Sequence, residues 1–109
     1  MNFDVIVTDD ALRDIKQLKK KYASFKADFA ALLASLEELP QQGEPLGKDC
    51  FKVRLAITAK QRGKSGGARV ITCVKIINGQ VFIIAIYDKS DLETMSDKKM
   101  EQRLRNAGL

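Results

Sequence analysis

Residues 68–87 read ARVITCVKIINGQVFIIAIY. Two runs rich in β-branched residues, 68–77 and 81–87, flank the pair Asn78-Gly79, which is typical of a tight hairpin turn. A third run of the same kind, CFKVRLAI at residues 50–57, precedes them. The turn joins the last two runs as an antiparallel hairpin, and a long, basic connection with glycines, 58–67, precedes them. The sequence therefore predicts a three-stranded antiparallel meander over residues 50–87.

The N-terminal half predicts a strand followed by a helical hairpin. Residues 3–8 are rich in Phe, Val and Ile and are expected to form a short strand. Asp9 or Asp10 is the predicted cap of a first helix, and Ser24 is the predicted cap of a second helix, which Pro40 ends. Apolar residues recur at helical spacing in both segments, so each helix has one core-facing stripe.

The remaining segments complete the predicted fold. Residues 41–49 contain two glycines and a proline and are expected to form a loop. Ser96 or Asp97 is the predicted cap of a short C-terminal helix with few apolar residues. The order β-α-α-β-β-β-α predicts an α+β protein whose helices pack on one face of an antiparallel sheet, and 109 residues suit a single domain, 1–109.

Positive charge is concentrated in one part of the chain. The formal net charge is +5, but the segment from Lys48 to Lys75 has eight basic residues and one acid, Asp49. This segment therefore carries +7, and the rest of the chain sums to −2. A merely solvated surface would mix both signs, so the pattern favours a polyanion, nucleic acid first, as a partner.

The strand pattern places several of these charges on one face of the sheet. Side chains alternate along a strand, so Lys52 and Arg54 lie opposite the apolar set of their strand, as do Arg69 and Lys75 on the next. One allowed register pairs Arg54 with Arg69. Like charges placed opposite one another are destabilising, which suggests a bound phosphate backbone. The alternative is that these long side chains simply extend into solvent.

The same register pairs the two cysteines, Cys50 and Cys73. They lack CxxC spacing, and the chain has no histidine, so two reduced structural thiols are expected and a metal site is not. The first residues do not resemble a secretory signal, and no apolar run approaches a membrane span. We therefore expect a cytoplasmic protein with no metal, no cofactor and no membrane partner.

Several short segments, spread over nearly the whole chain, form a recognisable pattern. The most specific is GKSGGARVI at 63–71, and the others are LP at 39–40, Gly43, LG at 46–47, FKVRL at 51–55 and IYDKS at 86–90. In these segments the chain resembles the RelE/ParE toxin superfamily, and most closely its HigB-like branch. The GKS triplet is not a phosphate-binding loop, because position 59, where that motif has its first glycine, is alanine.

The resemblance implies a toxin of a type II toxin–antitoxin system. Such a toxin is a ribosome-dependent endoribonuclease, or mRNA interferase, which cleaves mRNA and inhibits translation. Its expected partners are the ribosome, mRNA and a cognate antitoxin, for which a helix-turn-helix protein is one candidate. The resemblance implies these catalytic residues: Lys52, Arg54, Arg69 and Lys89, with Tyr87 nearby. A C-terminal tyrosine or histidine of some members has no counterpart here, because its place lies near Met95.

RNA cleavage by the 2′-hydroxyl needs a base, a stabilised phosphorane and an acid for the leaving oxygen. A lysine crowded by cations gives up its proton more readily, so Lys52 is the predicted base. Arg54 and Arg69 suit the phosphorane charge, and Lys89 or Tyr87 could protonate the leaving oxygen. Asp88 and Asp91 are alternative bases.

The other basic residues of the charged segment are candidates for RNA and ribosome binding. They are Lys48, Lys60, Arg62, Lys64 and Lys75. Two other functions remain open: a ParE-like toxin that acts on DNA gyrase without cleaving RNA, and a non-catalytic RNA-binding module.

Overall fold

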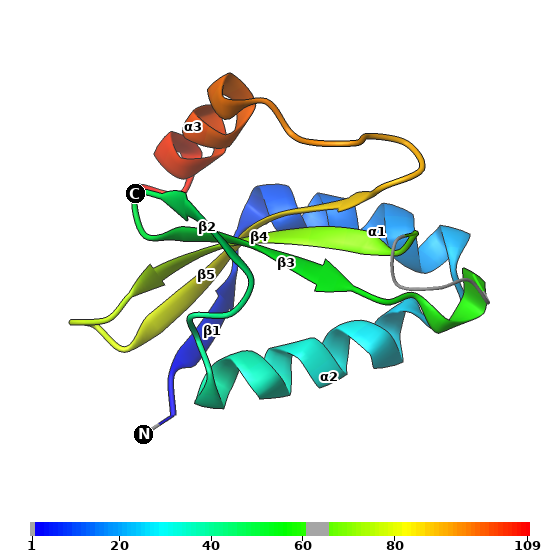
Figure 1. The fold of residues 1–109 in the computed structure, drawn as a ribbon, viewed down its shortest axis with the longest axis horizontal. Coiled ribbons are helices and arrows are strands. Elements are labelled where there is room, and N and C mark those ends of the chain that lie inside the picture. Colours follow the sequence, from blue (N-terminus) through cyan, green and yellow to red (C-terminus); the bar gives the residue numbers. More distant parts are fainter. Residues whose placement is uncertain (1, 61–65) are drawn as a thin grey trace.

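The structure, a computed structural model, describes residues 2–60 and 66–109. It has one five-stranded sheet with the strand order β1-β5-β4-β3-β2, shown in Figure 1. The strands are β1 (Asp4–Val7), β2 (Glu44–Gly47), β3 (Cys50–Leu55), β4 (Ala68–Lys75) and β5 (Gln80–Asp88). The helices are α1 (Asp9–Lys21), α2 (Phe25–Glu38), the 3₁₀ turn η1 (Thr58–Lys60) and α3 (Asp97–Asn106). None of the helices in the described ranges has the length and apolar character needed to cross a bilayer.

The predicted meander is confirmed: β3, β4 and β5 pair antiparallel in sequence order. β1 adds to β5 in parallel. The α+β class predicted from the order of the elements is therefore correct.

One strand was missed. Part of the predicted loop 41–49 forms β2, which pairs antiparallel with β3. The two residues between them, Lys48 and Asp49, both have positive φ, 54° and 64°. Positive φ at both central residues is the mark of a type I′ hairpin turn, which usually carries Asn-Gly or Asp-Gly. The dipeptide Lys-Asp does not have that signature.

The β4–β5 turn is longer than predicted. Lys75 pairs with Gln80, so the four residues 76–79 connect the strands, whereas the predicted strands left only residues 78–80 between them. The amide of Asn78 donates to the Lys75 carbonyl at 3.2 Å. Gly79 has φ 64° and supplies the left-handed residue of the turn.

Two of the helix caps differ from the predictions. Thr8, not Asp9 or Asp10, caps α1, because its side chain accepts a hydrogen bond from the amide of Ala11. Ser24 occupies the cap position of α2 as predicted, but its hydroxyl donates to Asp28 instead of capping. Ser96 caps α3 as predicted, accepting from the amide of Lys99.

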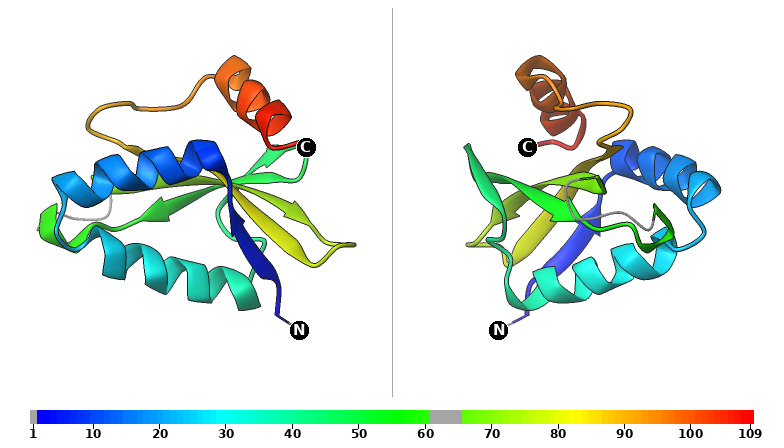
Figure 2. Two further views of the ribbon diagram at one scale, coloured as in Figure 1. Left: turned by 180° about the vertical axis from the view of Figure 1, so that it is seen from behind. Right: turned by 45° about the vertical axis from the view of Figure 1, so that its right-hand side comes forward.

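The helices lie on both faces of the sheet, so the prediction that all of them share one face is wrong. α1 and α2 cover one face, where they bury Phe25, Leu36, Val70 and other apolar side chains. α3 covers part of the opposite face, over a second cluster. Figures 1 and 2 show α2 and α3 on opposite sides of the sheet. The second cluster comprises Cys50, Ile71, Cys73, Ile84, Ala85, Tyr87 and Met95, with Leu46, Phe82, Met100, Leu104 and Leu109 partly buried against it.

A β-bulge in β5 makes the second cluster possible. Ile71 pairs with Ala85 and the next residue, Thr72, pairs with Ile83, so Ile84 has no partner residue. Ile83 packs with α1 and α2, whereas Ile84 and Ala85 both pack on the α3 side. An extra residue reverses the alternation of side chains beyond it. Ala85 and Tyr87 therefore face the α3 side of the sheet, whereas regular alternation from Ile83 would direct them toward α1 and α2.

Asp28 fixes the start of the segment that follows β3. Its carboxylate accepts hydrogen bonds from the amide and hydroxyl of Thr58, at 2.9 and 2.7 Å, and from the hydroxyl of Ser24 at 2.8 Å. Burial opposes ionisation of Asp28, but these hydrogen bonds outweigh it and lower its pKa. This carboxylate ties η1 to α2.

Gly43 lies at a close approach of the chain to β3. Its φ is 90°, and a Cβ built on it would lie 2.3 Å from the carbonyl oxygen of Lys52. Gly47 also has positive φ, 86°, but a Cβ added there would meet nothing within 4 Å. We expect Gly47→Ala to cost about 1–2 kcal/mol of unfolding free energy from φ alone. Gly43→Ala should cost about 1–3 kcal/mol more, because the added methyl group clashes with backbone.

Urea unfolding of the two variants measures this difference. Gly47→Ala serves as the matched control, since it carries the same substitution at a similar φ without the close contact. Equal losses of stability for the two variants would contradict the steric role assigned to Gly43.

Candidate functional site

A cleft of about 730 Å³ opens on the sheet face opposite α1 and α2. Its lining brings together four basic side chains from two strands and the segment after β5, which we call the cationic cleft: Lys52, Arg54, Arg69 and Lys89. Gly43, Glu44, Glu93 and Thr94 complete the wall. Four of the five predicted catalytic residues therefore lie in one cavity.

The two arginines that line the cleft lie opposite each other on neighbouring strands. The predicted register is confirmed, with Arg54 directly opposite Arg69. In two antiparallel strands, hydrogen-bonded residue pairs alternate with pairs that are not hydrogen-bonded. Asp49 and Val74 form a hydrogen-bonded pair, with 2.9 Å from the Val74 amide to the Asp49 carbonyl. The pair of Arg54 and Arg69 lies an odd number of pairs further along, so it is not hydrogen-bonded, and its Cβ atoms are about 4.5–5.5 Å apart.

Arg69 is buried, and it has no carboxylate partner in the part of the chain that the structure describes. Only 5% of the residue is exposed. Its guanidinium donates to the carbonyl oxygen of Ala68 at 3.1 Å, and no carboxylate within residues 2–60 and 66–109 pairs with it. Burying a charge costs free energy unless it is paired, and here the nearest strand neighbour is another arginine. The site is therefore suited to an anion that supplies the missing charge.

Glu44 supplies part of the negative charge in the cleft. Its Oε2 atom lies 3.7 Å from Nζ of Lys52, and its side chain is 68% exposed. An exposed pair at this distance is weak. A phosphate that enters the cleft can therefore displace Glu44 from Lys52 at little cost.

Tyr87 lies beside the cleft and does not line it. It pairs with Arg69 across β4 and β5, so both side chains are on the same face of the sheet. Tyr87 is 7% exposed, and its buried hydroxyl has no hydrogen-bond partner in the described part of the chain. Met95 packs in the same cluster.

The segment that carries Lys89 is anchored by its neighbour Asp88. The Asp88 carboxylate, 3% exposed, accepts hydrogen bonds from Lys21 Nζ at 2.9 Å, from the Tyr22 hydroxyl, and from the amide of Ser90 at 2.9 Å. Asp88 and Asp91 together raise the pKa of Lys21. The Asp88 side chain thus faces α1 and is not part of the cleft lining, which argues against its alternative role as a base.

The candidate RNA-binding side chains that the structure describes lie outside the cationic cleft. Lys48 and Lys75 both line a separate cavity beside α3, where Lys48 pairs with Glu101 at 2.9 Å. The side chain of Lys60, and the residues Arg62 and Lys64, lie outside the described residues. The cationic cleft therefore contains none of these five side chains that the structure describes.

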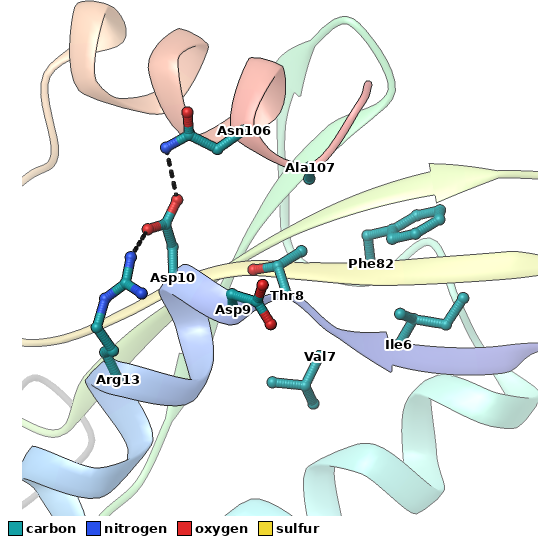
Figure 3. A pocket seen from close by; sticks show the side chains of 9 residues that line it. All are labelled: Ile6, Val7, Thr8, Asp9, Asp10, Arg13, Phe82, Asn106 and Ala107. Carbon is teal, nitrogen blue, oxygen red and sulfur yellow. Dashed lines mark hydrogen bonds and ion pairs between the residues drawn. The ribbon is translucent and has the colours of Figure 1, made fainter.

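A second cavity, of about 440 Å³, lies at the start of α1 (Figure 3). Asp10 there is paired with Arg13 and accepts a hydrogen bond from Asn106 at 3.0 Å. These contacts connect the end of α3 to α1. In the described ranges no three His, Cys, Asp or Glu side chains converge as a set of metal ligands.

No protein-family model and no curated protein matches this sequence. Solved structures do match. A free, doubly substituted RelE toxin from E. coli superposes with a TM-score of 0.63 at 18% identity, covering 100% of both chains. The chain has the RelE toxin fold. The RelE-like fold also matches a toxin–antitoxin complex, RelBE2, from Mycobacterium tuberculosis, with a TM-score of 0.60 at 21% identity over 81% of this chain and 99% of that chain.

The E. coli RelBE toxin–antitoxin complex matches with a TM-score of 0.62 at 19% identity, over 79% of this chain and 95% of that chain. The RelE-like fold therefore confirms the fold predicted from the resemblance. The roles of individual residues stay predictions.

Sequence reasoning missed the acidic part of the cleft wall. Glu44 was assigned to a loop, and its position opposite Lys52 depends on the unforeseen pairing of β2 with β3. Glu93 follows β5 in a segment without regular structure. No pattern in the sequence indicated either residue.

Proposed function

We propose that this chain is a toxin of a type II toxin–antitoxin system, and that it cleaves ribosome-bound mRNA in the cationic cleft. The observation that carries the proposal is the buried Arg69, which has no carboxylate partner in residues 2–60 and 66–109 and faces Arg54. Two guanidinium groups can bind one phosphate through paired hydrogen bonds. The RelE-like fold, shared with toxins that are found in complexes with antitoxins, supports this proposal.

The other residues of the cleft suit the steps of RNA cleavage. The negative charge of the phosphorane would be stabilised by Arg69 and Arg54. Lys52, on the strand of Arg54, is the proposed base for the 2′-hydroxyl, once a phosphate has displaced Glu44. Lys89, which also lines the cleft, is the proposed acid that protonates the leaving 5′-oxygen. The relation to the HigB-like branch remains a prediction from the sequence.

We expect the purified protein to cleave mRNA on programmed ribosomes without a bound metal ion, because Arg54, Arg69 and Lys89 supply positive charge in the cleft. The protein is treated with EDTA, desalted and added to intact ribosomes, and the 5′ ends of the message are mapped. Cleavage that disappears after this treatment and returns with added metal would contradict a metal-free mechanism. A message that stays intact would favour an RNA-binding module, and inhibition of DNA gyrase instead would favour a ParE-like toxin.

The proposed antitoxin should be recognised partly through charge. The cationic cleft and the +7 segment around it attract an acidic surface, so association should be fast at low salt and slower as salt rises. The chain is co-expressed with the product of the adjacent gene and purified through a tag on one protein, and the association rate is measured across a salt series. Failure to co-purify at low salt would contradict this pairing, and a rate independent of salt would contradict the role of charge.

A further inference from the structure

The two cysteines form a cross-strand pair that the cationic cleft does not use. Cys50 on β3 lies directly opposite Cys73 on β4, and both thiols are free. The adjacent residue pair, Asp49 and Val74, is hydrogen-bonded, so the pair of Cys50 and Cys73 has no backbone hydrogen bonds between its members. Opposed residues in such a pair have Cα atoms about 4.5 Å apart, within the range of about 4.4–6.8 Å found in disulfides. The sheet therefore already holds the two sulfur atoms near bonding geometry.

The environment favours ionisation of one thiol. Interaction with the neighbouring Cys50 thiol lowers the pKa of Cys73, against the effect of burial, and the Lys75 ammonium group assists. The same interaction, with burial, raises the pKa of Cys50, whose thiol donates a hydrogen bond to the carbonyl oxygen of Lys48 at 3.6 Å. The thiolate is the reactive form of cysteine. Cys73 is therefore the nucleophile of the pair, and Cys50 is the thiol that stays protonated beside it.

Small molecules have a route to the two thiols, although Cys73 is only 1% exposed and Cys50 only 6%. Cys73 lines a cavity of about 270 Å³ beside α3, and Cys50 lines a second one of about 150 Å³. Leu104 of α3 borders both cavities. A water molecule occupies about 30 Å³ in the liquid, so these spaces admit a molecule of the size of hydrogen peroxide.

We propose that Cys50 and Cys73 are a thiol–disulfide site that small hydroperoxides oxidise. The Cys73 thiolate attacks one peroxide oxygen, the O–O bond breaks, and the leaving oxygen takes a proton, which leaves a sulfenic acid on Cys73. The sulfur of Cys50 then attacks the Cys73 sulfur. The S–O bond breaks, and the hydroxide leaves as water with the proton of Cys50. Two electrons pass from the two thiols to the peroxide, and the disulfide joins β3 to β4.

This site is independent of the proposed RNA cleavage. Neither cysteine lines the cationic cleft. A disulfide here would fix β3 against β4 in the register that also opposes Arg54 and Arg69, four residues along each strand. Disulfides in reducing compartments are typically transient and redox-sensing.

The test is made on the folded wild-type protein. It is treated with hydrogen peroxide, and its free thiols, intact mass and oligomeric state are followed. We expect both thiols to be lost together, in a monomer whose mass is lower by two hydrogen atoms, with full recovery after dithiothreitol. Retention of both thiols, disulfide-linked dimers, or only the mass gain of added oxygen would each overturn the proposal.

Two kinds of variant test the assigned roles. With Cys50→Ser, the sulfenic acid on Cys73 should persist and be trapped by dimedone, whereas Cys73→Ser should give little trapping. The reverse result would overturn the assignment of the nucleophile. Leu104→Ala should speed oxidation severalfold by widening both cavities, whereas Leu33→Ala, a matched truncation against the other core, should not. Equal oxidation rates in these two variants would overturn the proposed access route.

Discussion

Arg69→Lys should lower the rate of mRNA cleavage by about 100-fold or more, although it keeps the positive charge. The Arg69 guanidinium is almost fully buried, and one of its nitrogens is fixed by the Ala68 carbonyl. Its remaining nitrogens can make paired hydrogen bonds to a phosphate, which a lysine ammonium cannot reproduce. The measurement is single-turnover cleavage on programmed ribosomes, with binding of the toxin to ribosomes measured in parallel.

The matched control is Arg13→Lys. Arg13 is on α1, which packs against the other face of the sheet, and it pairs with Asp10 outside the cleft. Its replacement should leave cleavage unchanged. If Arg69→Lys cleaves as fast as the wild type, then only the charge at this position matters. If Arg69→Lys is inactive but no longer folded, as judged by circular dichroism, then Arg54→Lys, at an exposed residue, tests the same requirement for a guanidinium.

Asp14→Ala should lower the free energy of unfolding by about 3 kcal/mol, because removing one partner of a nearly buried ion pair leaves the other charge uncompensated. The Asp14 carboxylate accepts two hydrogen bonds from Arg103 of α3, at 2.6 and 3.2 Å, and a third from the Ile86 amide at 2.9 Å. It raises the pKa of Arg103. α3 has no fully buried residue, so this ion pair provides much of its attachment.

The control for Asp14→Ala is Glu101→Gln, which removes the exposed ion pair between α3 and Lys48. The side chains of that pair are 71% and 48% exposed, so the expected loss is below about 1 kcal/mol. Urea unfolding monitored by circular dichroism compares the two variants. Equal losses would show that apolar contacts, and not the half-buried pair of Asp14 and Arg103, hold α3 on the sheet.

Much of the fold could be predicted from local patterns in the sequence, such as the alternation of side chains along a strand. Alternation along residues 50–57 and 68–77 separates Lys52, Arg54 and Arg69 from the apolar sets of their strands. The core-facing residues have odd numbers in the first strand and even numbers in the second. Two paired residues must face the same side of the sheet, so only registers in which their numbers add up to an odd sum are allowed. One of these is the observed register, which pairs Arg54 with Arg69. Side-chain periodicity is local, so the sequence is enough to predict it.

Other features depend on contacts between distant segments. The strand β2 was missed because its turn lacks the usual residues, and with it the place of Glu44 opposite Lys52. The face that α3 covers was also not predictable, since its attachment depends on Asp14, far away in the sequence. Because α3 has so few apolar residues, its sequence does not predict which surface it packs on.

The position of Lys89 shows most clearly where the sequence stops being sufficient. Strict alternation from the buried Val81 and Ile83 would direct Tyr87 and Lys89 toward α1 and α2. The bulge at Ile84 reverses that alternation and turns both onto the face of Arg69. The sequence by itself determined the class of fold and the face of the three basic residues on β3 and β4. Only the tertiary structure decided that Lys89 joins them, because a bulge depends on packing on both faces of the sheet and has no local signature in residues 81–87.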